Sequence, residues 1–119
     1  MQDKILKARA EGNSVGGSIE CAVIGLPAGI GEHMFDGLEN KISQAVFAIP
    51  AIKGIEFGNG FEGSDLKGSE NNDAFVYDDE GNLTLKTNHS GGIQGGISLG
   101  DVAPIVFDVA LKPTPSISK

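Results

Sequence analysis

The stretch Val-Ala-Pro-Ile-Val-Phe-Asp-Val-Ala-Leu at residues 102–111 decides the fold. From position 105 onward, strongly apolar residues alternate with a mixed set, which is the period-two pattern of a β-strand that packs one face on a core. The apolar face consists of Ile105, Phe107, Val109 and Leu111, and the other face of Val106, Asp108 and Ala110. Pro104 fits only near a strand start or an edge, because proline cannot donate to a strand ladder. The sequence therefore predicts a strand over residues 102–111.

A second pattern, with the period of a helix, lies over residues 35–49. Apolar side chains recur there at intervals of three and four, which places them on one face of an α-helix. Pro50 ends this helix, because the residue before a proline disfavours the α region. The apolar stripe consists of Phe35, Leu38, Ile42, Ala45 and Ile49. We expect this stripe to face the sheet.

Shorter signals complete the set of expected elements. Residues 15–24 read as a strand with apolar residues on both faces, which is typical of an interior strand. The element order favours an α+β fold in which a helix packs on a mainly antiparallel sheet, with residues 1–119 as a single domain. The other expected elements are a helix over 1–11 stopped by Gly12, a strand over 53–57, a hairpin over 74–77 and 82–86, and glycine-rich loops over 58–73 and 87–99.

Composition excludes several classes of protein. The chain has 119 residues, with 9 Lys and Arg against 16 Asp and Glu, a net charge of −7. This charge argues against nucleic acid or an anionic membrane as a partner held by electrostatics. A single Cys excludes an internal disulfide framework and a multi-cysteine zinc site. No apolar run approaches the length of a membrane span, and the first residues lack a signal-peptide pattern, so we expect a soluble, cytoplasmic protein.

Glycine is the unusual residue, with 18 in the chain, and two of the three candidate ligand segments are rich in it. Residues 58–63 match G-x-G-x-x-G after a strand, but no helix pattern follows them, which favours a turn over a dinucleotide site. Residues 90–98 hold bare backbone that fits either a ligand loop or a plain turn. Residues 112–116 set a cation and two hydroxyls on a proline-stiffened backbone, which fits either a phosphate grip or a strand exit.

The remaining reactive side chains form no catalytic constellation. Cys21 lies in a strand on an apolar face, which favours an inert thiol. His33 is most simply a surface residue, whereas His89 borders a glycine-rich loop and is the better site candidate. Residues 78–80 are acidic but lack calcium-loop spacing, so they read as a solvated hairpin tip. We expect no metal site.

Five segments, in order and spacing, resemble chorismate synthase. They are SVGGSIECAVIGLPAGIGEHMFDGLE (14–39), AIPAIKGIEFGNGF (48–61), GSENND (68–73), TNHSGGIQGGIS (87–98) and LKPTPSI (111–117). The resemblance covers nearly the whole chain. Asn13 and Ser116 depart from the family's usual Asp and Thr, and both keep a polar group.

The resemblance implies an activity. Members of the family are carbon–oxygen lyases that convert 5-enolpyruvylshikimate 3-phosphate to chorismate and phosphate, the last common step toward aromatic amino acids. This 1,4-elimination needs reduced FMN although no net redox change occurs, and NADP is associated with the family as well. The family fold is a β-α-β sandwich, with helices between two sheets, assembled as a homotetramer.

Flavin-contacting residues are likewise implied by the resemblance. The motif carried by Lys112, Pro113, Thr114, Pro115 and Ser116 lies beside the FMN phosphate and ribityl chain in the family. Gly95 and Gly96 stand where a side chain would collide with the flavin. Pro50 and Ala51 form the family's helix-exit dipeptide at the cofactor.

Other family segments have no counterpart in this sequence. The early histidine- and arginine-bearing segment, the Ser-Ala-Arg segment and the C-terminal Arg-Ser-Asp segment, which hold the acid–base groups and most cations, are absent. The chain is therefore expected to be an internal portion of a chorismate synthase that is inactive alone. Two alternatives stay open, a non-enzymatic FMN- or phosphate-binding module and a purely structural fragment. Oligomerisation of the chain is expected.

Overall fold

The computed structural model describes residues 2–113. Their helices and strands, in chain order, are α1 (Gln2–Ala10), β1 (Gly17–Val23), the 3-10 helix η1 (Met34–Asp36), α2 (Leu38–Phe47), β2 (Ile52–Phe57), the 3-10 helix η2 (Gly60–Asp65), α3 (Gly68–Asn71), β3 (Phe75–Tyr77), β4 (Leu83–Leu85), β5 (Ile93–Gln94), β6 (Ile97–Ser98), the 3-10 helix η3 (Gly100–Val102) and β7 (Ile105–Leu111).

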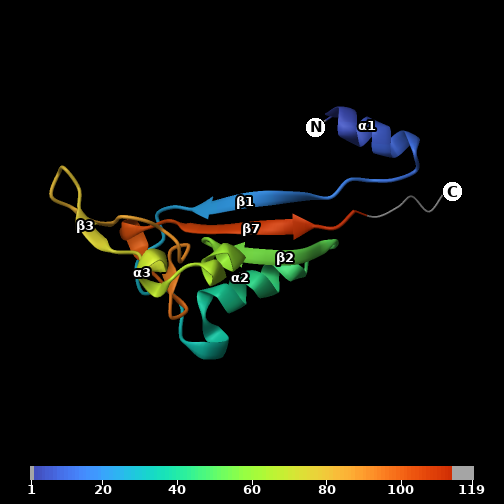
Figure 1. Ribbon diagram of the computed structural model, residues 1–119. Coiled ribbons are helices and arrows are strands. Elements are labelled where there is room, and N and C mark those ends of the chain that lie inside the picture. The colour runs from blue at the N-terminus through green and yellow to red at the C-terminus, as the bar shows by residue number, and fades with distance from the viewer. Residues whose placement is uncertain (1, 114–119) are drawn as a thin grey trace.

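The main sheet has three strands in the order β1-β7-β2, and β7 is antiparallel to both neighbours (Figure 1). Phe107 at its centre pairs with Cys21 on one side and Phe57 on the other. The predicted strand at 102–111 is confirmed from Ile105 onward, directly after Pro104. The expectation of an interior strand over residues 15–24 is wrong for the described part of the chain, because β1 lies at the edge of this sheet. Its apolar residues on both faces therefore stay partly open.

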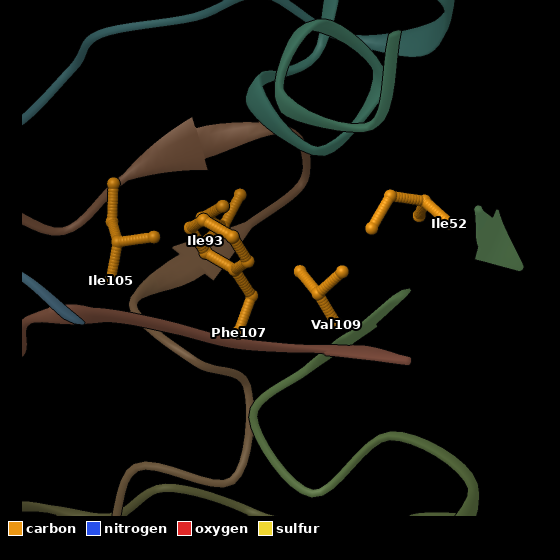
Figure 2. Packing of buried hydrophobic residues seen from close by; sticks show 5 residues of the cluster. All are labelled: Ile52, Ile93, Ile105, Phe107 and Val109. Atoms are coloured by element: carbon orange, nitrogen blue, oxygen red, sulfur yellow. The ribbon is translucent and has the colours of Figure 1, made fainter. Parts of the chain in front are cut away.

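The core lies on one face of this sheet, as Figure 2 shows. The predicted apolar face of β7 supplies three of its five buried residues, β2 and β5 supply one each, and α2 packs over them as expected. Helix residues Leu38, Ile42 and Val46 contact the cluster. The ring of Phe107 also lies 5.7 Å, centroid to centroid, from that of Phe57. The buried cluster consists of Ile52, Ile93, Ile105, Phe107 and Val109. The expected arrangement of a helix on an antiparallel sheet is confirmed.

The helix α2 is shorter than its sequence pattern. Gly37 has extended backbone with φ −64° and ψ 156°, so the helix starts after it, and residues 34–36 form a separate turn. Phe35, predicted to lie on the packed stripe, is instead 83% exposed. Ile49 is also exposed, and Val46 takes the third packing position. The N–H of Leu38, the first residue of α2, donates a hydrogen bond to the carbonyl oxygen of Gly96 in the β5–β6 turn, which explains why the helix begins at Leu38.

The two glycine-rich segments predicted as loops contain short regular elements. Residues 58–73 hold η2 and α3, and residues 87–99 hold the β5–β6 pair, in which Ile93 faces Ser98. Elements this short lack a periodic pattern to read. The predicted hairpin is confirmed as β3 and β4, with Tyr77 opposite Leu83.

The described residues form an elongated unit of 59 × 31 × 29 Å with a radius of gyration of 18.0 Å. A closed domain of this length would have a radius of gyration of roughly 13–14 Å. Figure 1 shows the reason, because α1 and the β3–β4 hairpin stand away from the main sheet. Large apolar side chains such as Ile24 and Phe61 are more than 80% exposed. The unit therefore leaves apolar surface open to further contacts.

Candidate functional site

Two predicted site segments meet at one end of the main sheet. The backbone N–H of Lys112 donates a 2.9 Å hydrogen bond to the carbonyl oxygen of Ala51. This bond continues the β2–β7 ladder one step beyond the pairing of Ile52 with Leu111. The dipeptide that leaves α2 and the residue that leaves β7 are thus neighbours, although they are far apart in the sequence.

Ala51 adopts a backbone conformation that alanine rarely accepts. Its φ is +72°, in the left-handed region, where the Cβ of an L-residue crowds the following carbonyl. The chain leaves α2 after Phe47 and must enter β2 at Ile52, so the reversal falls on very few residues. Such backbone strain persists only where the surroundings enforce it and is often found at functional sites.

A third family segment closes on the same end of the sheet. A Cβ on Gly16 would lie 2.8 Å from the carbonyl oxygen of Leu111 and 3.0 Å from Cδ of Pro113. Only glycine therefore fits without a shift of the neighbouring chain. Lys112 and Pro113 themselves are exposed. This cluster, named the exit cluster below, consists of Gly16, Pro50, Ala51, Lys112 and Pro113.

Three predicted contacts, Thr114, Pro115 and Ser116, lie outside the described residues.

Gly95 and Gly96, in the β5–β6 turn, have different surroundings. Both have positive φ, +61° and +84°. A Cβ on Gly96 would meet the carbonyl oxygen of Glu32 and lie 2.9 Å from Cα of Gly37, so packing within the chain explains this glycine. A Cβ on Gly95 would have nothing within 4 Å. Gly95 thus offers bare backbone beside open space, which is where a ligand could approach.

The Gly95 turn and the exit cluster lie at opposite ends of α2. The N–H of Leu38, the first residue of α2, donates a 2.8 Å bond to the carbonyl oxygen of Gly96, whereas Ala51 follows the end of the helix. A helix of ten residues is about 15 Å long. A single ligand that contacts both Gly95 and Lys112 would have to be elongated.

The most densely bonded side chain of the neighbouring loops is Asp73, which sequence reasoning missed. Its side chain is 1% exposed. Oδ1 accepts bonds of 2.7 Å from the Thr87 hydroxyl and 2.7 Å from the N–H of His89, and Oδ2 accepts a 3.0 Å bond from the N–H of Ser90. Burial by itself would raise the pKa of Asp73, but these donors outweigh burial and lower the pKa from the ordinary value of 3.8. Asp73 is therefore a charged anchor for the loop that begins at Thr87.

His89, the better of the two histidine candidates, is held by this anchor. Its ring nitrogen Nδ1 lies 2.9 Å from the carbonyl oxygen of Asn71 and 3.7 Å from Oδ1 of Asp73. The side chain is 29% exposed. His33, by contrast, is an exposed residue before η1, as expected.

The G-x-G-x-x-G match is explained by packing between loops. A Cβ on Gly58 would meet the carbonyl oxygen of His89 and lie 2.5 Å from the N–H nitrogen of Gly91. Gly63 similarly faces Oδ1 of Asn59 at 2.9 Å. The short helix η2 begins inside the match and only the short helix α3 follows it, as the interpretation of this stretch as a turn predicted. Gly58 thus allows the loop that contains His89 to approach the end of β2 closely, whereas Gly63 makes room for the Asn59 side chain.

The opposite face of the sheet carries a row of carboxylates. Glu20 and Glu56 each stand directly opposite Asp108 in the strand pairing. One oxygen of Glu56 accepts a 3.0 Å bond from the N–H of Phe61. Within residues 2–113, no group of three or more His, Cys, Asp or Glu side chains has a geometry that could hold a metal ion. This negative face is unsuited to a phosphorylated ligand.

No helix within residues 2–113 combines the length and apolar character needed to cross a membrane.

Comparison with known proteins agrees with the resemblance seen in the sequence. The family model described as chorismate synthase matches residues 1–119. Chorismate synthase of Opitutus terrae is 56% identical over 117 residues, which cover 98% of this chain and 31% of that protein. Chorismate synthase of Methanococcus aeolicus is 50% identical over 118 residues, or 99% of this chain and 31% of that protein. A solved structure titled "Crystal Structure of Chorismate Synthase" matches with a TM-score of 0.83 and 34% identity, over 96% of this chain and 34% of that one.

This chain belongs to the chorismate synthase family. It spans about a third of the length of the curated relatives it matches.

Proposed function

We propose that this chain forms part of a chorismate synthase, a lyase of the shikimate pathway. The enzyme would convert 5-enolpyruvylshikimate 3-phosphate to chorismate and phosphate, with reduced FMN as cofactor. The family match over the whole chain carries this proposal. The close approach of Ala51 to Lys112 adds support, because it joins two segments that the family resemblance assigns to one cofactor.

The chain's own share of the reaction would be to hold the flavin. Lys112 brings an exposed cation to the end of β7, where it can pair with a phosphate group. Thr114 and Ser116 would add hydroxyl donors, and Pro113 and Pro115 would stiffen the segment. Reduced flavin, when bound, supplies the electron density that lets phosphate leave the substrate.

The ring of the flavin would lie against Gly95. The backbone there is bare and faces open space, so a planar ring could approach without a side-chain clash. Pro50 and Ala51, which lie in the exit cluster with Lys112, would line the ribityl chain at its phosphate end. An FMN with an extended ribityl phosphate is an elongated ligand, as the separation along α2 requires.

The rest of the reaction would depend on residues beyond those of this chain. The sequence has 9 Lys and Arg against 16 Asp and Glu, which is too few cations for two phosphorylated ligands. We therefore propose that the 119 residues alone bind flavin weakly at most and form no chorismate. A homotetrameric assembly, a cytoplasmic location and a relation to NADP belong to the same proposal.

A chimera tests the proposed function. Residues 1–119 would replace the aligned part of the Opitutus terrae enzyme, and chorismate formation would be measured with substrate and reduced FMN. The unmodified relative is the positive control, and the 119-residue chain alone is the negative control. We expect activity from the chimera and none from the chain. A folded, assembled chimera that forms no chorismate would refute the proposal.

A further inference from the structure

Asp73 concentrates charge-assisted bonds on a single loop. Hydrogen bonds to a charged partner are stronger than neutral ones, and a buried carboxylate needs them to stay ionised. Its donors are one hydroxyl, on Thr87, and the consecutive backbone N–H groups of His89 and Ser90. The carboxylate therefore fixes the path of the backbone at residues 87–90, as well as the position of one side chain.

The Asp73 carboxylate holds the backbone of His89, and the contact of the His89 ring with Asn71 then sets its tautomer. The carbonyl oxygen of Asn71 can only accept, so Nδ1 of His89, at 2.9 Å, must carry the proton. Nε2 then keeps a free lone pair. Within residues 2–113 Nε2 has no hydrogen-bond partner, and no buried side-chain nitrogen or oxygen lacks one, so Nε2 is open to solvent. His89 thus presents a hydrogen-bond acceptor of defined position.

The anchored loop leads directly to Gly95. Nε2 of Gln94 lies 3.4 Å from the hydroxyl of Ser90. The N–H of Gly92 donates a 2.9 Å bond to Oδ1 of Asn88, so the turn between the anchor and β5 is held internally. A displacement at residues 89–90 would therefore be transmitted to the bare backbone at Gly95.

We propose that Asp73 is a positioning residue for the flavin site. Its carboxylate holds the loop at residues 87–92, keeps His89 in the tautomer protonated on Nδ1, and leaves Nε2 as an acceptor for an N–H donor of the bound ring. The part of this inference that concerns the ligand rests on the proposed function, whereas the part that concerns the tautomer of His89 does not.

Nitrogen NMR of ¹⁵N-histidine tests the tautomer directly. The chain contains only two histidines, so His33 serves as an exposed internal reference. In a neutral imidazole, the chemical shifts of the two ring nitrogens report which of them carries the proton, so the spectra are recorded in mildly alkaline buffer. Free histidine favours the proton on Nε2, so a predominance of the Nδ1-protonated form by about fivefold at His89 is diagnostic.

Substitutions then separate positioning from folding. Asp73→Asn should return His89 to a tautomer mixture like that of His33, whereas Glu70→Gln, at an exposed carboxylate of α3, should leave it unchanged. Asp73→Glu keeps the charge and should give an intermediate ratio. If Asp73→Asn does not fold, Asp73→Glu decides the question. The proposal would be overturned if the His89 tautomer ratio in folded Asp73→Asn, or in Asp73→Glu where Asp73→Asn does not fold, equalled that of the unmodified chain.

Flavin binding by the chimera tests the second part. Asp73→Asn should weaken reduced FMN binding by about tenfold or more, by analogy with the loss of the hydrogen-bond partner that orients a metal-ligating histidine. Glu70→Gln should match the unmodified chimera. Equal affinities for Asp73→Asn and Glu70→Gln would contradict a role at the flavin. A parent chimera that binds no flavin would refute the proposed function, while the tautomer measurement would still decide the role of Asp73.

Discussion

The N–H of Lys112 and the carbonyl oxygen of Ala51 are joined by a 2.9 Å hydrogen bond at the end of the main sheet. The bond holds the strained exit of α2 against the exit of β7. It therefore fixes the backbone of Lys112 at the point where this residue leaves the sheet. The strain at Ala51 and the placement of the cation are two aspects of one arrangement.

Replacing Ala51 with glycine should stabilise the chain. Alanine in the left-handed region costs about 1–2 kcal/mol, and glycine removes this cost but adds about 0.5–1 kcal/mol of unfolded-state entropy. We expect a net gain of about 0.5–1 kcal/mol in the free energy of unfolding, measured by urea denaturation. Ala48→Gly is the matched control, because Ala48 has a helical φ of −69° and should lose stability. An equal loss in both variants would contradict the assigned strain.

Alanine at Gly95 and at Gly96 should have different consequences. Both substitutions incur the left-handed backbone cost, but only the Gly96 variant also collides with Glu32 and Gly37. We expect Gly95→Ala to lose about 1–2 kcal/mol and Gly96→Ala clearly more in thermal denaturation. In the chimera, Gly95→Ala should impair flavin binding although it remains folded. Unchanged flavin affinity in Gly95→Ala would argue against a ring at this position.

The loss of stability on shortening a side chain of β7 should depend on which face of the strand the side chain occupies. Ile105 is 3% exposed on the packed face of β7, and Ile105→Ala should cost about 2–5 kcal/mol through lost burial and a cavity. Val106 is half-buried on the other face, and Val106→Ala should cost about 1 kcal/mol or less. Urea denaturation of both variants checks the orientation of β7. Similar losses would contradict it.

The stabilisation by Asp73 should disappear in acid. Its pKa is lower in the folded chain than the ordinary 3.8, so the charged form contributes fully above that value and is lost as the pH falls through the lowered pKa. At neutral pH, Asp73→Asn should cost about 2 kcal/mol. The difference in unfolding free energy between parent and variant should shrink below about pH 4. A difference that stays constant with pH would show that the carboxylate charge is not the cause.

The main strand and helix could be predicted because their patterns are local. Alternation at residues 105–111 specifies a strand with one buried face, and it does so without knowledge of its neighbours. Nothing within residues 15–24 indicates how many strands lie beside it, so the edge position of β1 could not be read. Phe35 fits the helical spacing, but a contact from Gly96, far along the chain, sets the start of α2.

The candidate site, like the fold, could be predicted from the sequence only in part. Lys112 and Gly95 could be chosen from the family motif and from residue chemistry, but their separation along α2 requires the folded chain. Asp73 gave no local signal, because its donors lie more than ten residues further along the sequence. A buried carboxylate that is satisfied by a distant loop becomes visible only when both segments are in place.

The most direct test of the central claim is the affinity of the chimera for reduced FMN with and without the Lys112 side chain. Lys112→Ala removes the charge proposed to pair with the phosphate, and Lys86→Ala removes another exposed charge, at the end of the β3–β4 hairpin. A charged hydrogen bond is worth about 1.5–3 kcal/mol, so the account predicts affinity about 10- to 100-fold weaker for Lys112→Ala and unchanged for Lys86→Ala. Equal affinities in the two variants would contradict the account.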